Sequence, residues 1–394
     1  MLLYAPPPTP IPVTIERRGE RFVLLRGGKP YVVKGAGAHE NVLDELKRAG
    51  ANSVRTWGGD DMVPLLDRCH RMGLSVTFGM WLNKRSEGMD YGDPAALDRQ
   101  ADDVRRTIRR YRNHPAILAW GLGNEMELED MRPELFRQIE RLAKIAREED
   151  PNHPAITVLA DMWPEKMALL KAHCPSVQAL GINSYGGLPT LAGRMKEWDR
   201  PYLVTEWAFG APGSTGETPW KSPTEPTGTE KARLATANWR GPLRDPKVLG
   251  SYFFHWSRSG ADTSGWFSAF LKTGEKTPIV DAMARAWGGR VGTPAPTIER
   301  VEAPVAPTLA PDAPLTVRLR VRGADSVSYE VLGDDPKKRF VGDFERPTAP
   351  AGTGAGGTTL TVRAPKEPGR YRRGFVARNG KGGADTASVP FPVR

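Results

Sequence analysis

The sequence predicts a (β/α)8 barrel followed by a small β-sandwich of the immunoglobulin-like type, and three observations lead to this fold class. Short apolar runs alternate with amphipathic helical patterns through most of the 394 residues, which is typical of parallel strands covered by helices. Eight such runs fall within about 260 residues, close to the length of one closed barrel. After Trp287 an alternation with period two dominates, which is typical of antiparallel strands.

The eight expected barrel strands are short and mostly apolar, as strands buried on both faces are. They are residues 31–35, 52–57, 74–82, 116–123, 155–160, 177–185, 202–207 and 251–256. Between them, apolar residues recur with helical spacing, for example in residues 104–111 and 135–145. Pro133 stands where a first-turn proline begins a helix.

Changes in composition give the expected domain boundaries. We expect a proline-rich segment at 1–15, the barrel with an N-terminal hairpin at 16–290, a proline-rich linker at 291–314 and the sandwich at 315–394. The hairpin is expected around Gly27-Gly28, a strong turn signal. The chain as given starts without the basic and apolar regions of a signal peptide. A leader removed upstream would suit its proline-rich start, so the compartment stays open.

Composition argues against several classes of function. The net charge is +10, but the basic residues are spread along the chain rather than gathered into the basic face that nucleic-acid binding needs. No apolar run is long enough to span a membrane. Cys69 and Cys174 have no metal-ligand spacing and are expected to be buried free thiols. We expect no metal and no cofactor, and the sequence leaves the oligomeric state open.

Polar and aromatic residues gather where the expected strands end, which is where reactive side chains lie in this kind of barrel. The candidate site residues are His39, Arg55, Trp57, Trp81, Asn124, Glu125, Asn183, Tyr185, Glu206, Trp207 and Trp256. Cleavage of a glycosidic bond needs one carboxylic acid to protonate the leaving oxygen and a second carboxylate facing the anomeric carbon. Tryptophan rings stack on sugar rings, and polar groups hold sugar hydroxyls. The set therefore favours sugar chemistry on a carbohydrate partner.

Four segments carry a resemblance to a known family. RNHPAILAWGLGNE (112–125) is similar to the acid/base strand of glycoside hydrolase clan A, and within it of the family 2 barrels. RPYLVTEW (200–207) resembles the nucleophile strand, and the segments 28–40 and 46–58 resemble the first two strands. The resemblance covers residues 28–288. The chain departs from the family by carrying a hairpin, not sandwich domains, before the barrel.

The resemblance implies a role for each matching residue. Glu125 would be the acid/base, and Glu206 the nucleophile of a reaction that retains anomeric configuration. Asn124 would bind a sugar 2-hydroxyl, and Arg55 and Tyr185 would orient Glu206. Trp256 would form the floor of the subsite at the anomeric carbon. A retaining enzyme has its carboxyl groups about 5–5.5 Å apart.

Several alternatives stay open at this level. A transglycosylase would use the same two glutamates, and a non-catalytic carbohydrate-binding barrel would need neither. Glu127 and Glu129 follow Glu125 closely and could take its role. The long connection at residues 208–228 either lines the sugar site, as long loops often do, or is a disordered insertion. No motif distinguishes glucoside, galactoside, mannoside or uronide substrates, although the scarcity of basic strand-end residues disfavours an acidic sugar.

Overall fold

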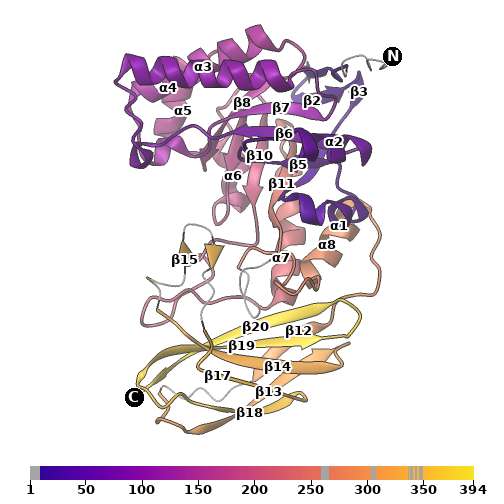
Figure 1. Cartoon of the computed structure of the whole chain (residues 1–394), viewed down its shortest axis with the longest axis vertical. Helices are drawn as coiled ribbons and strands as arrows, with labels where there is room; N and C mark the ends of the chain where they lie inside the picture. The colour runs from indigo at the N-terminus through magenta and orange to yellow at the C-terminus, as the bar shows by residue number, and fades with distance from the viewer. Residues whose placement is uncertain are drawn as a thin grey trace, which may run out of the picture. The chain divides into compact units, whose positions relative to one another are not determined.

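Eight parallel strands close into a barrel, which confirms the predicted fold class (Figure 1). The computed structural model describes residues 9–258, 266–302, 308–335, 337, 340–341, 344–345 and 349–394. The barrel strands are β4 (Val33–Ala38), β5 (Ser53–Arg55), β6 (Ser75–Met80), β7 (Ile117–Leu122), β8 (Ala155–Ala160), β9 (Ala179–Asn183), β10 (Tyr202–Trp207) and β11 (Val248–Trp256). They neighbour one another in chain order, and β11 closes the ring by pairing between β10 and β4.

Helices follow the strands in the alternation that the sequence predicts. They are α1 (Leu43–Arg48), α2 (Val63–Arg71), α3 (Pro94–Tyr111), α4 (Pro133–Glu149), α5 (Pro164–His173), α6 (Leu191–Arg194), α7 (Gly228–Arg240) and α8 (Pro278–Trp287). Short 3-10 turns are η1 (Glu40–Val42), η2 (Arg85–Glu87), η3 (Met126–Leu128), η4 (Leu188–Thr190) and η5 (Pro242–Arg244). The two longest helices, α3 and α4, lie side by side (Figure 1). Pro133 begins α4 as expected. No helix in the described ranges is long and apolar enough to cross a membrane.

The chain divides into two compact units, which are described separately. The first comprises residues 1–47, 51–207 and 239–253, and the second comprises residues 48–50, 208–238 and 254–394.

The barrel interior of the first unit contains a buried polar layer around Tyr252. Its hydroxyl bonds to Ser53 Oγ at 2.8 Å and to the hydroxyl of Thr77. Burial raises the pKa of Tyr252 above its ordinary value. Gly35 makes room for this ring, since a Cβ there would lie 2.5 Å from it.

An N-terminal hairpin closes the bottom of the barrel. β1 (Val13–Arg18) pairs with β2 (Arg21–Arg26), and Val13 and Leu24 share one apolar cluster with Leu118, Leu203 and Leu249 from the strands. The expected turn at Gly27-Gly28 is present, but it leads only into the two-residue strand β3 (Lys29–Pro30). The second arm of the expected hairpin is short, because the following apolar run belongs to β4.

The second unit contains two antiparallel sheets that share one core, which confirms the predicted sandwich. One sheet has the order β12 (Thr297–Glu302), β13 (Pro314–Arg322), β18 (Thr359–Arg363). The other has the order β17 (Gly352–Gly356), β14 (Ser326–Gly333), β19 (Gly369–Arg378), β20 (Ala384–Val393). A separate pair is formed by β15 (Phe340–Val341) and β16 (Phe344–Glu345). Strand β12 lies inside the proline-rich stretch 291–314. Both cysteines of the chain are free and buried, as expected.

Candidate active site

Side chains from the carboxyl ends of β5, β7, β9 and β10 form one hydrogen-bonded network in the first unit. Arg55 and Asn183 end their strands, Glu206 lies one residue before the end of β10, and Asn124-Glu125 follow β7 after Gly123. The network therefore joins residues far apart in sequence, because strands of a parallel barrel all point their carboxyl ends to one face.

Glu206 is held by three donors. Its Oε1 accepts from Trp57 Nε1 at 2.8 Å and from the Arg55 guanidinium. Its Oε2 accepts from Tyr185 Oη at 2.6 Å. Arg55 and Glu206 are 2% and 3% exposed. This ion pair is therefore shielded from water, and the orientation of its two groups is well defined. The Arg55 guanidinium also stacks over the Trp57 ring, 4.9 Å from the ring centroid.

Two asparagines connect this ion pair to Glu125. Asn124 Oδ1 accepts from Arg55 Nη2 at 2.6 Å and from Asn183 Nδ2 at 3.1 Å. Asn183 Nδ2 also donates to Glu125 Oε1 at 2.9 Å, while its own Oδ1 accepts from Thr205 Oγ1 at 2.8 Å. Because the Asn124 oxygen takes two protein donors, its amide NH2 group is the part left to donate to a ligand.

The backbone at Glu125 turns sharply out of β7. Gly123 has a φ of 74° and Glu125 a φ of 53°, the left-handed region that a non-glycine residue rarely adopts. The Glu125 N–H donates to Val158 O of β8 at 2.9 Å. Such strained backbone persists where surrounding contacts hold it, and it clusters at functional sites.

The two carboxylates that could rival Glu125 have other partners. Glu127 is buried and forms an ion pair with Lys166 at 2.6 Å, while also accepting from Ala160 N. Glu129 accepts from the backbone N–H and hydroxyl of Ser86, and these hydrogen bonds lower its pKa. With its pKa lowered, Glu129 is a poor proton donor, and Glu127 is held in its own buried ion pair, which favours Glu125 as the acid.

The remaining sequence-predicted residues are not part of this network. Trp81 is 45% exposed, with its Nε1 donating to Glu87. His39 is exposed at the start of η1. Trp207 is fully buried, donates to Ser251 Oγ at 2.9 Å and stacks with Trp239, so it has no open ring face for a ligand. Neighbours in a strand point to opposite faces, and Glu206 already takes the mouth side.

Two expectations concern the second unit. Trp256 is buried there against Phe270 and Trp287, and its role as a subsite floor stays a prediction. Within residues 208–228, Trp220 Nε1 and Ser222 Oγ donate to Asp334, at 2.9 and 2.6 Å. The segment thus has defined contacts inside its own unit.

Sequence reasoning missed the residues that hold the loop after Glu125. Lys166 of α5 pairs with Glu127 and lies 4.0 Å from the centroid of the Trp163 ring. Both members of this pair are almost completely buried. The sequence offered one sign of this pair, an acidic residue after β7 and a basic residue after β8. Pairs of opposite charge are also common on protein surfaces, so this sign did not distinguish a buried pair.

The arrangement can stabilise one ionised carboxylate beside a cation and hold a second carboxyl against a neutral amide. That is a division of labour suited to a nucleophile and a proton donor. In the part of the chain that the structure describes, no group of three or more His, Cys, Asp or Glu is arranged to hold a metal ion.

The chain is similar to a known protein family and to several solved structures. The family described as glycosyl hydrolases family 2, TIM barrel domain, matches residues 28–222. Among solved structures, the chain is similar to Bacteroides uniformis β-glucuronidase 2 bound covalently to cyclophellitol-6-carboxylate aziridine, with 15% identity and a TM-score of 0.53, over 97% of this chain and 48% of that one.

Two further solved structures are similar over the shorter span. They are a β-D-glucuronidase of Dictyoglomus thermophilum (19% identity, TM-score 0.54, 71% of this chain and 54% of that one) and a family 2 β-galacturonidase of Eisenbergiella tayi bound to galacturonate (16%, 0.53, 70% and 54%). The chain spans about half the length of these proteins. At these identities the likeness is one of fold.

Proposed function

Because residues 28–222 match the TIM barrel domain of glycosyl hydrolases family 2, we propose that the chain is a retaining β-glycosidase, with Glu206 as nucleophile and Glu125 as acid/base. The observation that carries the proposal is the network that joins the two carboxyls through Asn183, Asn124 and Arg55. It holds one carboxylate beside a guanidinium and the other against a neutral amide.

In the first step, a Glu206 oxygen attacks the anomeric carbon and forms an ester bond to it. The bond from that carbon to the leaving oxygen breaks, and Glu125 transfers its proton to that oxygen. Tyr185 and Trp57 keep the Glu206 carboxylate oriented for attack, which lowers the entropic cost of reaching the reactive geometry. The amide NH2 of Asn124 donates to a hydroxyl of the bound sugar.

In the second step, water attacks the anomeric carbon and the ester bond to Glu206 breaks. Glu125, now ionised, takes the proton from that water. Two displacements at one carbon return the original configuration. If a sugar hydroxyl replaces the water, the same residues perform transglycosylation, so product analysis at high acceptor concentration separates these two outcomes.

We propose a neutral sugar at the anomeric subsite. The similar solved proteins are named for glucuronide and galacturonide substrates. A site that binds the carboxylate of such a sugar needs a positively charged side chain to pair with it. In the described network around the two glutamates, the guanidinium of Arg55 is already bonded to Glu206, Asn124 and Thr205 O. A panel of aryl β-glycosides tests this, and hydrolysis of the uronides alone would contradict it.

Azide rescue tests the two roles separately. In Glu125→Ala, azide should intercept the glycosyl-enzyme from the face opposite Glu206 and give the β-glycosyl azide. In Glu206→Ala, azide should take the place of the nucleophile and give the α-glycosyl azide. Glu129→Gln is the matched control, because Glu129 is a nearby exposed carboxylate on the same loop.

The outcomes are distinct. Full activity of Glu206→Gln, or azide products with the opposite configurations, would refute the assignment. Glu206→Gln should still bind sugar, since only the attacking oxygen is lost. A chain that binds oligosaccharides but cleaves none, even as the wild type, would instead be a carbohydrate-binding barrel.

A further inference from the structure

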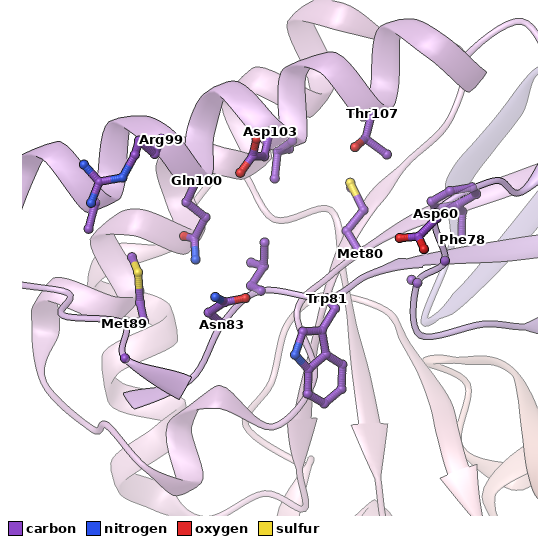
Figure 2. Close-up of a pocket in the computed structure, with 17 residues that line it drawn as sticks. Asp60, Phe78, Met80, Trp81, Asn83, Met89, Arg99, Gln100, Asp103 and Thr107 are labelled. Carbon is purple, nitrogen blue, oxygen red and sulfur yellow. The ribbon is translucent and has the colours of Figure 1, made fainter. Parts of the chain in front are cut away.

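A cavity lies between strand β6 and helix α3 (Figure 2). Its volume is about 480 Å³, within the range of about 300–1,000 Å³ that small-molecule sites occupy. Residues 58–60 of the loop after β5 and residues 78–83, which end β6 and begin the loop after it, form one side, and the face of α3 that carries Gln100 and Thr107 forms the other. All of these residues belong to the first unit.

The cavity combines an apolar floor with uncharged hydrogen-bonding groups. Phe78 and Met80 line it from β6, and Figure 2 shows Met80 pointing toward α3. Among the described residues, nothing hydrogen-bonds to the side-chain amide of Asn83 or the hydroxyl of Thr107. Gln100 is 8% exposed, and its Oε1 accepts from Gln138 Nε2 at 3.2 Å, so it is held in place at the wall.

The charged residues at the cavity do not make it a site for an ion. Asp60 and Asp103 lie at its edge together with Arg99, so charges of both signs are present. Asp103 also pairs with Arg106 on the same helix. A ligand with hydroxyl groups and apolar C–H faces matches this lining better than a phosphate, a carboxylate or a metal ion.

One wall of the cavity is next in sequence to the glutamate network. Trp57, which donates to Glu206, is followed by Gly58 at the cavity wall. Gly58 packs against Trp81, since a Cβ on it would lie 3.5 Å from the Trp81 Cβ. The Trp81 ring is turned away from α3 (Figure 2) and its Nε1 is fixed by Glu87 at 3.1 Å. An exposed indole in a fixed orientation is a stacking surface for a sugar ring.

We propose that this cavity is a second sugar-binding subsite, which holds a unit of the same chain that is cleaved at the glutamates, with Trp81 between the two. This inference rests on the proposed function and specifies its substrate class, an extended β-linked oligo- or polysaccharide of neutral sugars. A substrate too short to reach the cavity forgoes its hydrogen bonds, so kcat/KM rises with chain length.

The test measures kcat/KM across β-1,3- and β-1,4-linked gluco-, manno-, xylo- and galacto-oligosaccharides of two to eight units. For the chain type that is cleaved, we expect the ratio of long to short substrates to be on the order of tenfold or more, as one or two added hydrogen bonds would give. Thr107→Trp, which fills the cavity, and Asn83→Ala, which removes a hydrogen-bonding group, should lower that ratio toward one.

Arg106→Trp is the matched control. It adds the same bulky side chain to the neighbouring position of α3, where the arginine is largely exposed and does not line the cavity, and it should keep the wild-type ratio. A wild-type ratio near one, or an unchanged ratio in both Thr107→Trp and Asn83→Ala, would overturn the subsite.

Failure of the proposed function gives a different result. If the wild type hydrolyses no glycoside, the same oligosaccharides are titrated calorimetrically against the full chain with and without Thr107→Trp. Binding that Thr107→Trp abolishes supports the subsite without catalysis. Absence of binding, or binding that Thr107→Trp leaves unchanged, overturns it.

Discussion

Replacing Tyr185 by phenylalanine should slow the enzyme without disturbing its fold. The change removes one hydroxyl, whose oxygen lies 2.6 Å from Glu206 Oε2. Among the described residues, this hydroxyl is the donor to Oε2, whereas Oε1 has both Trp57 and Arg55. A hydrogen bond to a charged group contributes about 1.5–3 kcal/mol, so kcat/KM should fall by about 10- to 150-fold.

Trp57→Phe is the matched comparison, because it also removes one donor from Glu206 and keeps an aromatic ring. Arg55 still holds Oε1 in that variant, so we expect a loss of less than about tenfold. Both are measured with the aryl β-glycoside that the panel identifies, and thermal midpoints within a few degrees of the wild type verify folding. A Tyr185→Phe enzyme within about threefold of the wild type, or one more active than Trp57→Phe, would refute the reasoning.

Three further predictions concern stability and packing. Lys166→Met leaves Glu127 as a buried unpaired charge, so the free energy of unfolding in urea should fall by about 3–5 kcal/mol. Burial raises the pKa of Asp385 from 3.8 to about 6. The stabilisation from this carboxyl is therefore complete below pH 3.8 and is lost as pH rises through 6, about 3 kcal/mol in all. Asp385→Asn should remove this pH dependence from denaturation midpoints measured between pH 4 and 7. Gly37→Ala would bring a methyl group within 2.3 Å of the Trp57 ring, so its kcat/KM should fall at least as far as that of Trp57→Phe.

Each of these predictions has a control and a contrary result. Adding Glu127→Met to Lys166→Met should restore much of the lost stability, and a single variant within about 1 kcal/mol of the wild type would contradict the first. An unchanged pH slope in Asp385→Asn argues against the second. Gly193→Ala, where an added Cβ meets nothing within 4 Å, should keep full activity. Equal losses in Gly193→Ala and Gly37→Ala would contradict the third.

The strands and the candidate glutamates could be predicted because one physical rule governs both. All six residues of β7 and of β10 are buried, since helices cover one face and the barrel interior the other. Such strands read as unbroken apolar runs. A carboxylate at the end of such a run then falls at the mouth of the barrel, as Glu125 and Glu206 do.

Contacts between loops could not be predicted in the same way. Glu127 and Lys166 are 39 residues apart, and their pairing depends on the shapes of the loops after β7 and β8, which sequence periodicity does not encode. The cavity beside α3 has the same origin, because it is the space left between two loops and a helix. Trp207 shows a further limit, because it follows Glu206 in β10 and alternation along a strand turns the two side chains to opposite faces.

The hairpin under the barrel has a consequence for synthesis at the ribosome. Leu24 belongs to the same apolar cluster as Leu249, and Phe22 N donates to Pro246 O at 2.9 Å. A nascent chain emerges N-terminus first, at roughly 5–20 residues per second. Roughly 10–45 s therefore pass between the synthesis of the hairpin and the synthesis of β11, which supplies its last packing partners. During that interval the apolar face of the hairpin is exposed to solvent. Binding of chaperones to ribosome-bound chains should therefore end once β11 has been synthesised.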